Sequence, residues 1–338
     1  MDLHLFWFAT LGVLLAGYAI LDGFDLGVGI LHLTVRDDEE RRILMNSIGP
    51  LWDGNEVWLV TFGGALFAAF PNAYATAFSA FYLPFMLLLF ALIFRAVSLE
   101  FRSKRPSTIW RQAWDVSFCA ASTLATFLFG VAVGNSIQGI PIGADGEFAG
   151  SLGSLLRPYP LLVGLLAVAT FAMHGSIYLY LKTEGGLQKR IHRWMWRTFG
   201  LFLVLYLFTT MVTLVMLPSV TRNFQSMPWA WAAVLLNILA VANIPRAIYL
   251  ERPGYAFLSS SVTIAALIFL FGIALFPNLI VSSLNPSWSL DIHNAASSAK
   301  TLGLMRTIAF LGMPFVLAYT GIVYWVFRGK VELGKFSY

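Results

Sequence analysis

The sequence contains little charge: Asp, Glu, Lys and Arg make up 12% of its 338 residues, against about 25% in an ordinary soluble domain. So few charged side chains cannot cover a globule of this size in water. Hydrophobic residues make up 58% of the chain, and the mean hydropathy is +0.74. These values exclude a soluble enzyme and a disordered chain. The net charge of +5 does not indicate a nucleic-acid binder, because the basic residues lie in short gaps between apolar runs.

Metal-ligating residues are also scarce. The one cysteine, Cys119, lies within an apolar run, which excludes a disulfide framework and a thiolate metal site. Among five histidines only His174 lies well inside such a run, and we interpret it as a hydrogen-bonded interior residue. Haems with paired axial ligands would need more facing histidines or methionines, so we expect no cofactor on this chain's own ligands. No basic segment precedes Arg36, so we expect no cleavable signal peptide.

Apolar runs of about 20 residues, the length of a membrane-spanning helix, dominate the chain. They are continuous rather than alternating, which favours helices over a β-barrel. We therefore expect an all-α integral membrane protein with a single polytopic domain over residues 1–338. Spans one to four and five to eight would form two four-helix bundles, with the ninth helix at the periphery. The nine predicted spans are residues 5–32, 47–70, 74–97, 113–135, 158–181, 198–217, 229–250, 257–276 and 303–327.

The basic residues alternate between the gaps. The gaps after spans one, three, five and seven, the C-terminal tail, and the span edges at Arg95 and Arg246 hold all of the 22 Lys and Arg except Arg157, Arg222, Lys300 and Arg306. Because cytoplasmic loops carry the excess of Lys and Arg, we predict a cytoplasmic C-terminus and an external N-terminus. This orientation requires an odd number of spans.

Four acidic residues lie within predicted spans and away from the span edges: Asp22, Asp25, Asp53 and Glu56. A charge at the membrane centre costs at least ~2.5 kcal/mol, so each needs a partner, a proton or water. Asp22 and Asp25 are three residues apart and share a helix face, as do Asp53 and Glu56. With the predicted orientation, both pairs lie in the cytoplasmic half of the membrane.

Arg95 in the third span reaches a similar depth, and two interpretations of the acids follow. The acids form a proton path that opens to the cytoplasm, or they pair with Arg95 and only hold the helices in register. Four acids exceed one arginine, so we expect Arg95 to serve one acid and another to carry a proton near pH 7. Gly23-x-x-x-Gly27 has the spacing for close helix packing, and Gly63-Gly64 is the expected complementary surface.

These residues resemble the signatures of a known family. The segment Asp22–Gly29 (DGFDLGVG) and the segments Asn46–Pro50 and Trp52–Leu59 (WDGNEVWL) are similar to two motifs of subunit II of cytochrome bd-type quinol oxidases. Further similar segments are Gly63–Pro71, Phe94-Arg95, Phe101–Lys104, Gly134-Asn135, Gln138-Gly139 and Asn294–Ser298. Two positions differ from some members: Leu51 replaces a histidine, and Glu56 replaces a glutamine.

The resemblance implies a non-haem subunit of a quinol:O2 oxidoreductase in a bacterial or archaeal cytoplasmic membrane. Its partner, subunit I, would hold haems b558, b595 and d and the quinol site, in a heterodimer that draws protons from the cytoplasm. Asp53 lies at the family position implicated in proton delivery. Small single-span accessory subunits, membrane lipids and a structural quinone stay open as partners; no nucleic acid is expected.

Two rival functions remain. A proton-coupled secondary transporter would use the same acids, but it predicts broken helices paired across inverted halves, whereas these acids lie only in the first two spans. A purely structural scaffold subunit would leave the proton path to subunit I.

Overall fold

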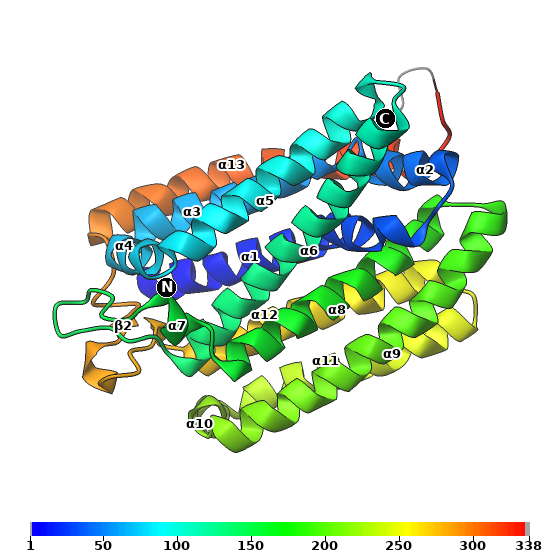
Figure 1. The fold of residues 1–338 in the computed structure, drawn as a ribbon. Coiled ribbons are helices and arrows are strands. Elements are labelled where there is room, and N and C mark those ends of the chain that lie inside the picture. Colours follow the sequence, from blue (N-terminus) through cyan, green and yellow to red (C-terminus); the bar gives the residue numbers. More distant parts are fainter. Residues whose placement is uncertain (1, 335–338) are drawn as a thin grey trace.

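The computed structural model describes residues 2–334, and the described chain is helical apart from loops and one small sheet (Figure 1). Long helices lie side by side, which agrees with the expected all-α class. The helices of 18 residues or more are α1 (Leu3–Leu31), α3 (Trp52–Ala69), α5 (Tyr82–Phe101), α6 (Thr108–Gln138), α8 (Pro158–Lys182), α9 (Gly185–Met216), α11 (Trp231–Tyr249), α12 (Pro253–Leu275) and α13 (Ala299–Val326).

Short elements cover the two ends of the helix assembly. The N-terminal end carries the chain start, α4, α7, α10 and a two-stranded antiparallel sheet; the opposite end, called the α2 end below, carries α2 and the last described residues (Figure 1). These elements are η1 (His32–Thr34), α2 (Asp38–Ile48), α4 (Pro71–Ala80), η2 (Arg102–Lys104), α7 (Leu152–Leu155), α10 (Ser219–Ser226), η3 (Pro228–Ala230), β1 (Asn278–Ile280), η4 (Pro286–Trp288) and β2 (Leu290–Asp291).

Eight helical segments within residues 2–334 are long and apolar enough to cross a membrane, against the nine predicted spans. The difference is the second predicted span, 47–70. There α2 occupies the predicted start, a turn at Gly49–Leu51 follows, and α3 begins only at Trp52. The first two turns of α3 contain Asp53, Asn55 and Glu56, which lower the hydropathy of this 18-residue helix.

Two further predicted boundaries are wrong. The third span, 74–97, is divided into α4 and α5 at Phe81. Pro84 lies in the first turn of α5, and its ring would clash with the carbonyl four residues earlier if the helix continued from α4. The sixth span, 198–217, begins earlier, because α9 starts at Gly185 and its first turns carry the basic residues assigned to a loop.

Helix α1 packs against helices from both halves of the chain, namely α3, α6, α8, α12 and α13. Glycine permits the closest of these contacts: a Cβ on Gly27 would lie 2.0 Å from the backbone oxygen of Phe171 and 2.9 Å from Gly175 on α8. The predicted intrachain packing of Gly23 and Gly27 is therefore confirmed. The predicted partner surface is wrong, because Gly63 and Gly64 have no atom within 4 Å of an added Cβ.

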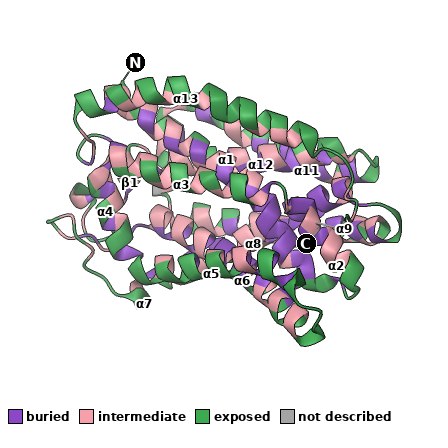
Figure 2. Cartoon of the chain, turned by 90° about the horizontal axis from the view of Figure 1, so that it is seen from above, coloured by how far each residue is buried: buried purple, intermediate pink, exposed green. Residues whose placement is uncertain are grey.

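Helix α13 lies at the edge of the assembly, against α1 and α3. Leu302 is its one buried residue within the described chain, and Figure 2 shows the helix exposed along most of its length. Burial is concentrated instead around the second half of α1, where Phe24, Leu26 and Val28 have no exposed surface.

Candidate functional site: an acidic cluster on helix α1

Asp22 and Asp25 lie in the most buried part of the protein, and both are 0% exposed. The helix reaches this depth because small residues flank the acids and let α8 approach. Burial without compensation would be costly for any carboxylate, so each oxygen is expected to have a partner. The two side chains meet different partners.

Asp22 forms a bidentate ion pair with Arg95 on α5. Its two oxygens accept from Nη1 at 3.0 Å and from Nη2 at 2.5 Å, and Arg95 is also fully buried. The same Nη1 donates to Oε1 of Glu56 on α3 at 2.8 Å. The Glu56 side chain is 24% exposed, so this ion pair connects the buried cluster to the surface of α3. Arg95 thus joins α1, α3 and α5.

Asp25 is held by neutral groups. Asn55 on α3 donates from Nδ2 to Asp25 Oδ2 at 2.7 Å and to the Leu21 carbonyl at 3.2 Å. Tyr324 on α13 donates its hydroxyl hydrogen to Asn55 Oδ1 at 2.9 Å. These bonds fix the Asn55 amide and tie the edge helix α13 to the cluster. Asn55 and Tyr324 were not predicted as site residues, although Asn55 lies between Asp53 and Glu56 in the sequence.

Asp53 does not join the other three acids. Its side chain is exposed on α3, and no hydrogen bond or ion pair reaches it from the described residues. It shares a helix face with Glu56, one turn away. By exposure the order is Asp53, then Glu56, and then Asp22 and Asp25, which are both fully buried.

Arg95 serves two acids, so the expectation that it pairs with one is wrong. Asp22, Asp25 and Glu56 carry three carboxyl groups around one guanidinium, so full ionisation would leave the cluster with two excess negative charges. Asp25 has no cation as a direct partner in the described chain, and one of its oxygens, Oδ1, has no hydrogen-bond partner. This arrangement favours an uncharged carboxyl at Asp25.

A second buried ionic cluster, which was not predicted from the sequence, lies at the α2 end. Asp115 on α6 accepts from Arg102 Nε at 2.6 Å and from Arg41 Nη1 at 2.8 Å. His32 Nε2 lies 2.6 Å from Asp115 Oδ1, and Arg102 also pairs with Asp38 at 2.7 Å. The hint in the sequence was that Asp115 and His32 both lie at span ends near basic residues.

The interpretation of His174 as a hydrogen-bonded interior residue is confirmed. Its Nε2 lies 3.0 Å from the Ile20 carbonyl oxygen and its Nδ1 lies 2.7 Å from Ser260 Oγ. The ring also stacks on Phe257, with the ring centroids 4.8 Å apart. No group of three or more His, Cys, Asp or Glu in the described residues could hold a metal ion.

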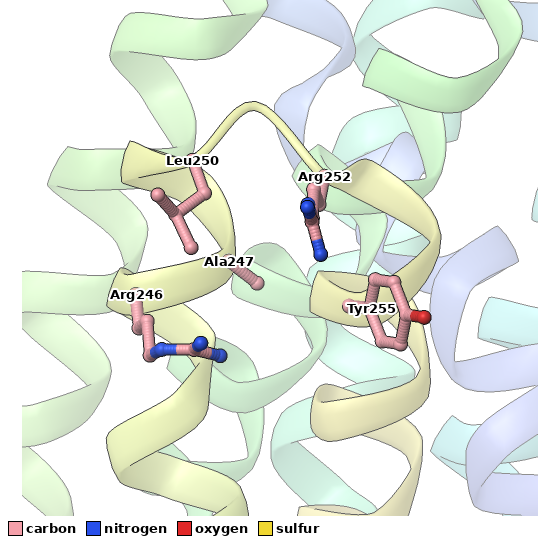
Figure 3. Close-up of a pocket in the computed structure, with 5 residues that line it drawn as sticks. All are labelled: Arg246, Ala247, Leu250, Arg252 and Tyr255. Atoms are coloured by element: carbon pink, nitrogen blue, oxygen red, sulfur yellow. The ribbon is translucent and has the colours of Figure 1, made fainter.

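A hollow of about 180 Å³ lies at the turn between α11 and α12. Figure 3 shows Arg246 and Arg252 directed toward the space between the helix ends, beside Tyr255. Arg246 Nη1 donates to Asn243 Oδ1 at 3.1 Å, and no ion pair within residues 2–334 involves either arginine. None of the described residues that line the hollow is an acid, so it is chemically distinct from the acidic cluster.

Comparison with known proteins identifies the family. The family model described as cytochrome bd terminal oxidase subunit II matches residues 3–327. The chain is 36% identical over 360 residues to cytochrome bd-I ubiquinol oxidase subunit 2 of Escherichia coli (strain K12), covering 97% of this chain and 95% of the relative. It is 35% identical over 333 residues to cytochrome bd ubiquinol oxidase subunit 2 of Bacillus subtilis (strain 168), covering 98% and 97%.

A solved structure supports the same fold. A chain of the bd oxidase from Geobacillus thermodenitrificans superposes with a TM-score of 0.80 at 18% identity, covering 97% of this chain and 99% of that chain. Family model, relatives and fold agree over nearly the whole length, so this chain belongs to the cytochrome bd terminal oxidase subunit II family, whose members are multi-pass membrane proteins of a quinol oxidase.

Proposed function

We propose that this chain is the non-haem subunit of a quinol:O2 oxidoreductase and that it assembles with a haem-bearing subunit I. Membership of the family and the two ubiquinol oxidase relatives support the assignment. In the proposal α3 is a ninth span, the N-terminus is external and the α2 end is cytoplasmic. Spans α1, α3, α5, α6 and spans α8, α9, α11, α12 form two four-helix bundles, with α13 at the periphery.

The exposed surface of α3 is the proposed contact with subunit I. Asp53 and Gly54 are exposed there, and a Cβ on Gly54 or Gly64 would meet no atom within 4 Å. A charged side chain beside open glycines on an apolar helix is a poor surface for lipid and a suitable one for another helix. The haems and the quinol site belong to subunit I in this proposal.

Co-purification tests the assembly. With subunit I co-expressed and tagged, this chain should be recovered in equal amount with a haem spectrum, and this chain purified alone should show none. Replacing Gly54 by Leu should reduce recovery, whereas Gly200→Leu, at another open helix position on α9, should not. Equal recovery of both variants, or a stable haem-free chain with transport activity, contradicts the proposal.

We infer further that the acidic cluster provides a proton-entry path from the cytoplasm for the reduction of O2 to water. The observation that carries this inference is the order of carboxyl groups that joins the buried Asp25 and Asp22, through the partly exposed Glu56, to Asp53 on the surface proposed to face subunit I. Carboxyl groups in such an order can pass protons where isolated apolar helices cannot. A negative excess around one guanidinium favours proton uptake by the cluster.

The matched test compares acid-to-amide variants inside and outside the cluster. Glu56→Gln should slow proton uptake and oxidase turnover, whereas Glu147→Gln, in the loop after α6, should leave both unchanged. Haem content should stay the same in each. Equal turnover in both variants would assign Glu56 to structure.

The scaffold alternative has one observation in its favour. The bidentate pair of Arg95 with Asp22 ties α1 to α5, and such a pair fixes helix register whatever else it does. A scaffold role predicts that cluster variants lose stability and haem together. A proton role predicts that turnover falls while the complex stays intact.

Membrane lipid is the remaining proposed partner of this chain. The hollow at the α11–α12 turn presents two guanidinium groups beside Tyr255, a suitable site for the phosphate of an anionic lipid. Replacing both Arg246 and Arg252 by Gln should weaken phosphatidylglycerol retention in native mass spectrometry. The double variant R222Q/K300Q removes the same amount of charge at other positions and should leave phosphatidylglycerol retention unchanged. Equal retention contradicts the assignment.

A further inference from the structure

One face of α1 collects buried polar residues over its second half. At 3.6 residues per turn, positions 18, 22, 25, 29 and 32 fall within about 80° of one another around the helix axis. They are Tyr18, Asp22, Asp25, Gly29 and His32, and none is more than 2% exposed apart from the glycine, which is also buried. We call this face the α1 stripe. It runs from the acidic cluster to the ionic cluster at the α2 end.

Unpartnered buried polar atoms gather around the α1 stripe. Of nine such side-chain atoms in the described residues, six lie on the stripe or on residues that contact it or its ionic partners. Those six are Tyr18 Oη, Asp25 Oδ1, His32 Nδ1, Arg95 Nε, Arg102 Nη1 and Ser122 Oγ. A buried polar group without a hydrogen bond costs about 1–3 kcal/mol, and in high-resolution structures protein or ordered water almost always satisfies it. Their clustering therefore indicates bound water rather than scattered defects.

Ser122 on α6 lies midway along the stripe. A Cβ on Gly29 would lie 2.0 Å from Ser122 Oγ, so the hydroxyl packs directly on the α1 backbone between Asp25 and His32. Asp25 and His32 are seven residues apart, or about 10 Å along the helix, too far for direct hydrogen bonding. The Ser122 hydroxyl with roughly two waters would span that distance at ordinary hydrogen-bond lengths.

We propose that the α1 stripe is a binding site for a chain of ordered water that connects His32 and Asp115 to Asp25 through the Ser122 hydroxyl. Such water needs two to four polar partners, which the unpartnered atoms supply. His32 is suited to the end of the water chain that lies at the α2 end of the protein. Its Nε2 contacts Asp115 at 2.6 Å, while its Nδ1 is buried and has no hydrogen-bond partner among the described residues. The ring of Phe118, 5.2 Å from the His32 ring, limits the width of the chain there.

The use of this water for proton entry rests on the proposed function. An imidazole can accept a proton on one nitrogen and release one from the other, so His32 can relay between Asp115 and the water. Arg41 and Arg102 also contact Asp115, and Asp38 pairs with Arg102. The stripe would then be the entrance to Asp25 from the α2 end, and the acids Glu56 and Asp53 would continue the route toward subunit I.

The first test is a structure of the assembled complex at a resolution that shows ordered water. Density is expected within hydrogen-bonding distance of Ser122 Oγ, Asp25 Oδ1 and His32 Nδ1. In infrared spectra the corresponding water bands should shift in H2(18)O and should lose intensity in Ser122→Ala. A dry stripe, with these atoms bonded directly to protein, overturns the inference whatever the activity.

The second test measures proton uptake by the complex. Ser122→Ala should slow uptake about fivefold, the factor for one lost hydrogen bond of ~1 kcal/mol, with haem content unchanged. Thr126→Val is the matched control, because the Thr126 hydroxyl one turn away bonds only to the Ser122 carbonyl of its own helix. The double variant Gly29→Ser with Ser122→Gly moves the hydroxyl across the contact and should restore uptake.

His32→Gln provides an independent readout. It should slow uptake and remove one titrating step from the pH profile, and the double variant with Ser122→Ala should be no slower than the worse single variant. His174→Gln, at the other buried histidine, should not change the profile. If proton uptake is slow in Asp25→Asn but normal in Ser122→Ala and His32→Gln, the relay through the stripe is wrong, while a proton role of Asp25 stands. If proton uptake is normal in all of these variants and in Glu56→Gln, and ordered water is seen along the stripe, the water site stands. The proposed proton function is then contradicted.

Discussion

Asp22→Asn tests the pairing on which the acidic cluster is built. Asp22 and Arg95 are both 0% exposed and share two hydrogen bonds, so the variant leaves a buried guanidinium without its main counter-charge. Glu56 remains at 2.8 Å from Arg95, but its side chain is 24% exposed and only one of its oxygens makes the contact. The amide oxygen introduced by the substitution can still accept one N–H.

The expected magnitude follows from burial. Removing one partner of a buried ion pair costs about 3–5 kcal/mol, because the other charge stays in a poorly solvated site. Arg95 keeps its contact with Glu56 and one hydrogen bond to the introduced amide, so the expected loss lies near the lower figure, about 3 kcal/mol. Removing both charges with Asp22→Leu and Arg95→Leu leaves no buried cation, so the double variant should be more stable than either single leucine variant.

The assay is a double-mutant cycle on the purified protein, with unfolding in SDS followed by tryptophan fluorescence. Asp22→Asn, Asp22→Leu and Arg95→Leu should each destabilise the fold, and the coupling free energy between the two leucine substitutions should reach about 3 kcal/mol. Glu147→Gln controls for loss of an exposed carboxylate. Additive effects, with a coupling below about 0.5 kcal/mol, refute the reasoning.

Three further predictions follow from other contacts. Gly27→Ala should destabilise the fold by about 1–3 kcal/mol in the same SDS assay, because its Cβ would lie 2.0 Å from the Phe171 oxygen. Gly12→Ala in the same helix meets nothing within 4 Å and should be neutral or slightly stabilising. Equal stability of the two variants contradicts the packing. Tyr324→Phe should cost about 1 kcal/mol by loss of the hydrogen bond to Asn55, and an unchanged unfolding midpoint speaks against a role of α13 in the cluster. Asp53→Asn should lower oxidase turnover in a quinol oxidation assay while optical spectra keep the haems, and loss of the haems would instead indicate a role in assembly.

Apolar run length and the spacing of acids predicted much of this protein. Run length, charge position and three-residue spacing predicted the all-α class, the burial of Asp22 and Asp25, and their neighbour Arg95. These features depend on residue types and on their spacing along the sequence. The acids that Arg95 contacts could not be predicted from the sequence. Whether Arg95 contacts one acid or two depends on how far α3 lies from α5, and no local pattern contains that distance.

The missed features arise from tertiary contacts. Asn55 and Tyr324 are 269 residues apart, and nothing in either segment marks the hydrogen bond between them. The cluster around Asp115 combines α6, α2 and η2 in the same way. The division of the third span at Phe81 depends on Pro84, which is visible in the sequence. The long apolar run favoured one continuous helix over residues 74–97 despite this proline.

The most direct test of the central claim is quinol-driven proton uptake by the assembled oxidase in liposomes. Uptake from the side of the α2 end should slow in Glu56→Gln and in Asp25→Asn, with haem spectra and quinol binding unchanged, and should stay normal in Glu147→Gln. Normal uptake in both cluster variants, with the complex intact, would contradict the claim that the acids of this chain carry protons to the site of O2 reduction.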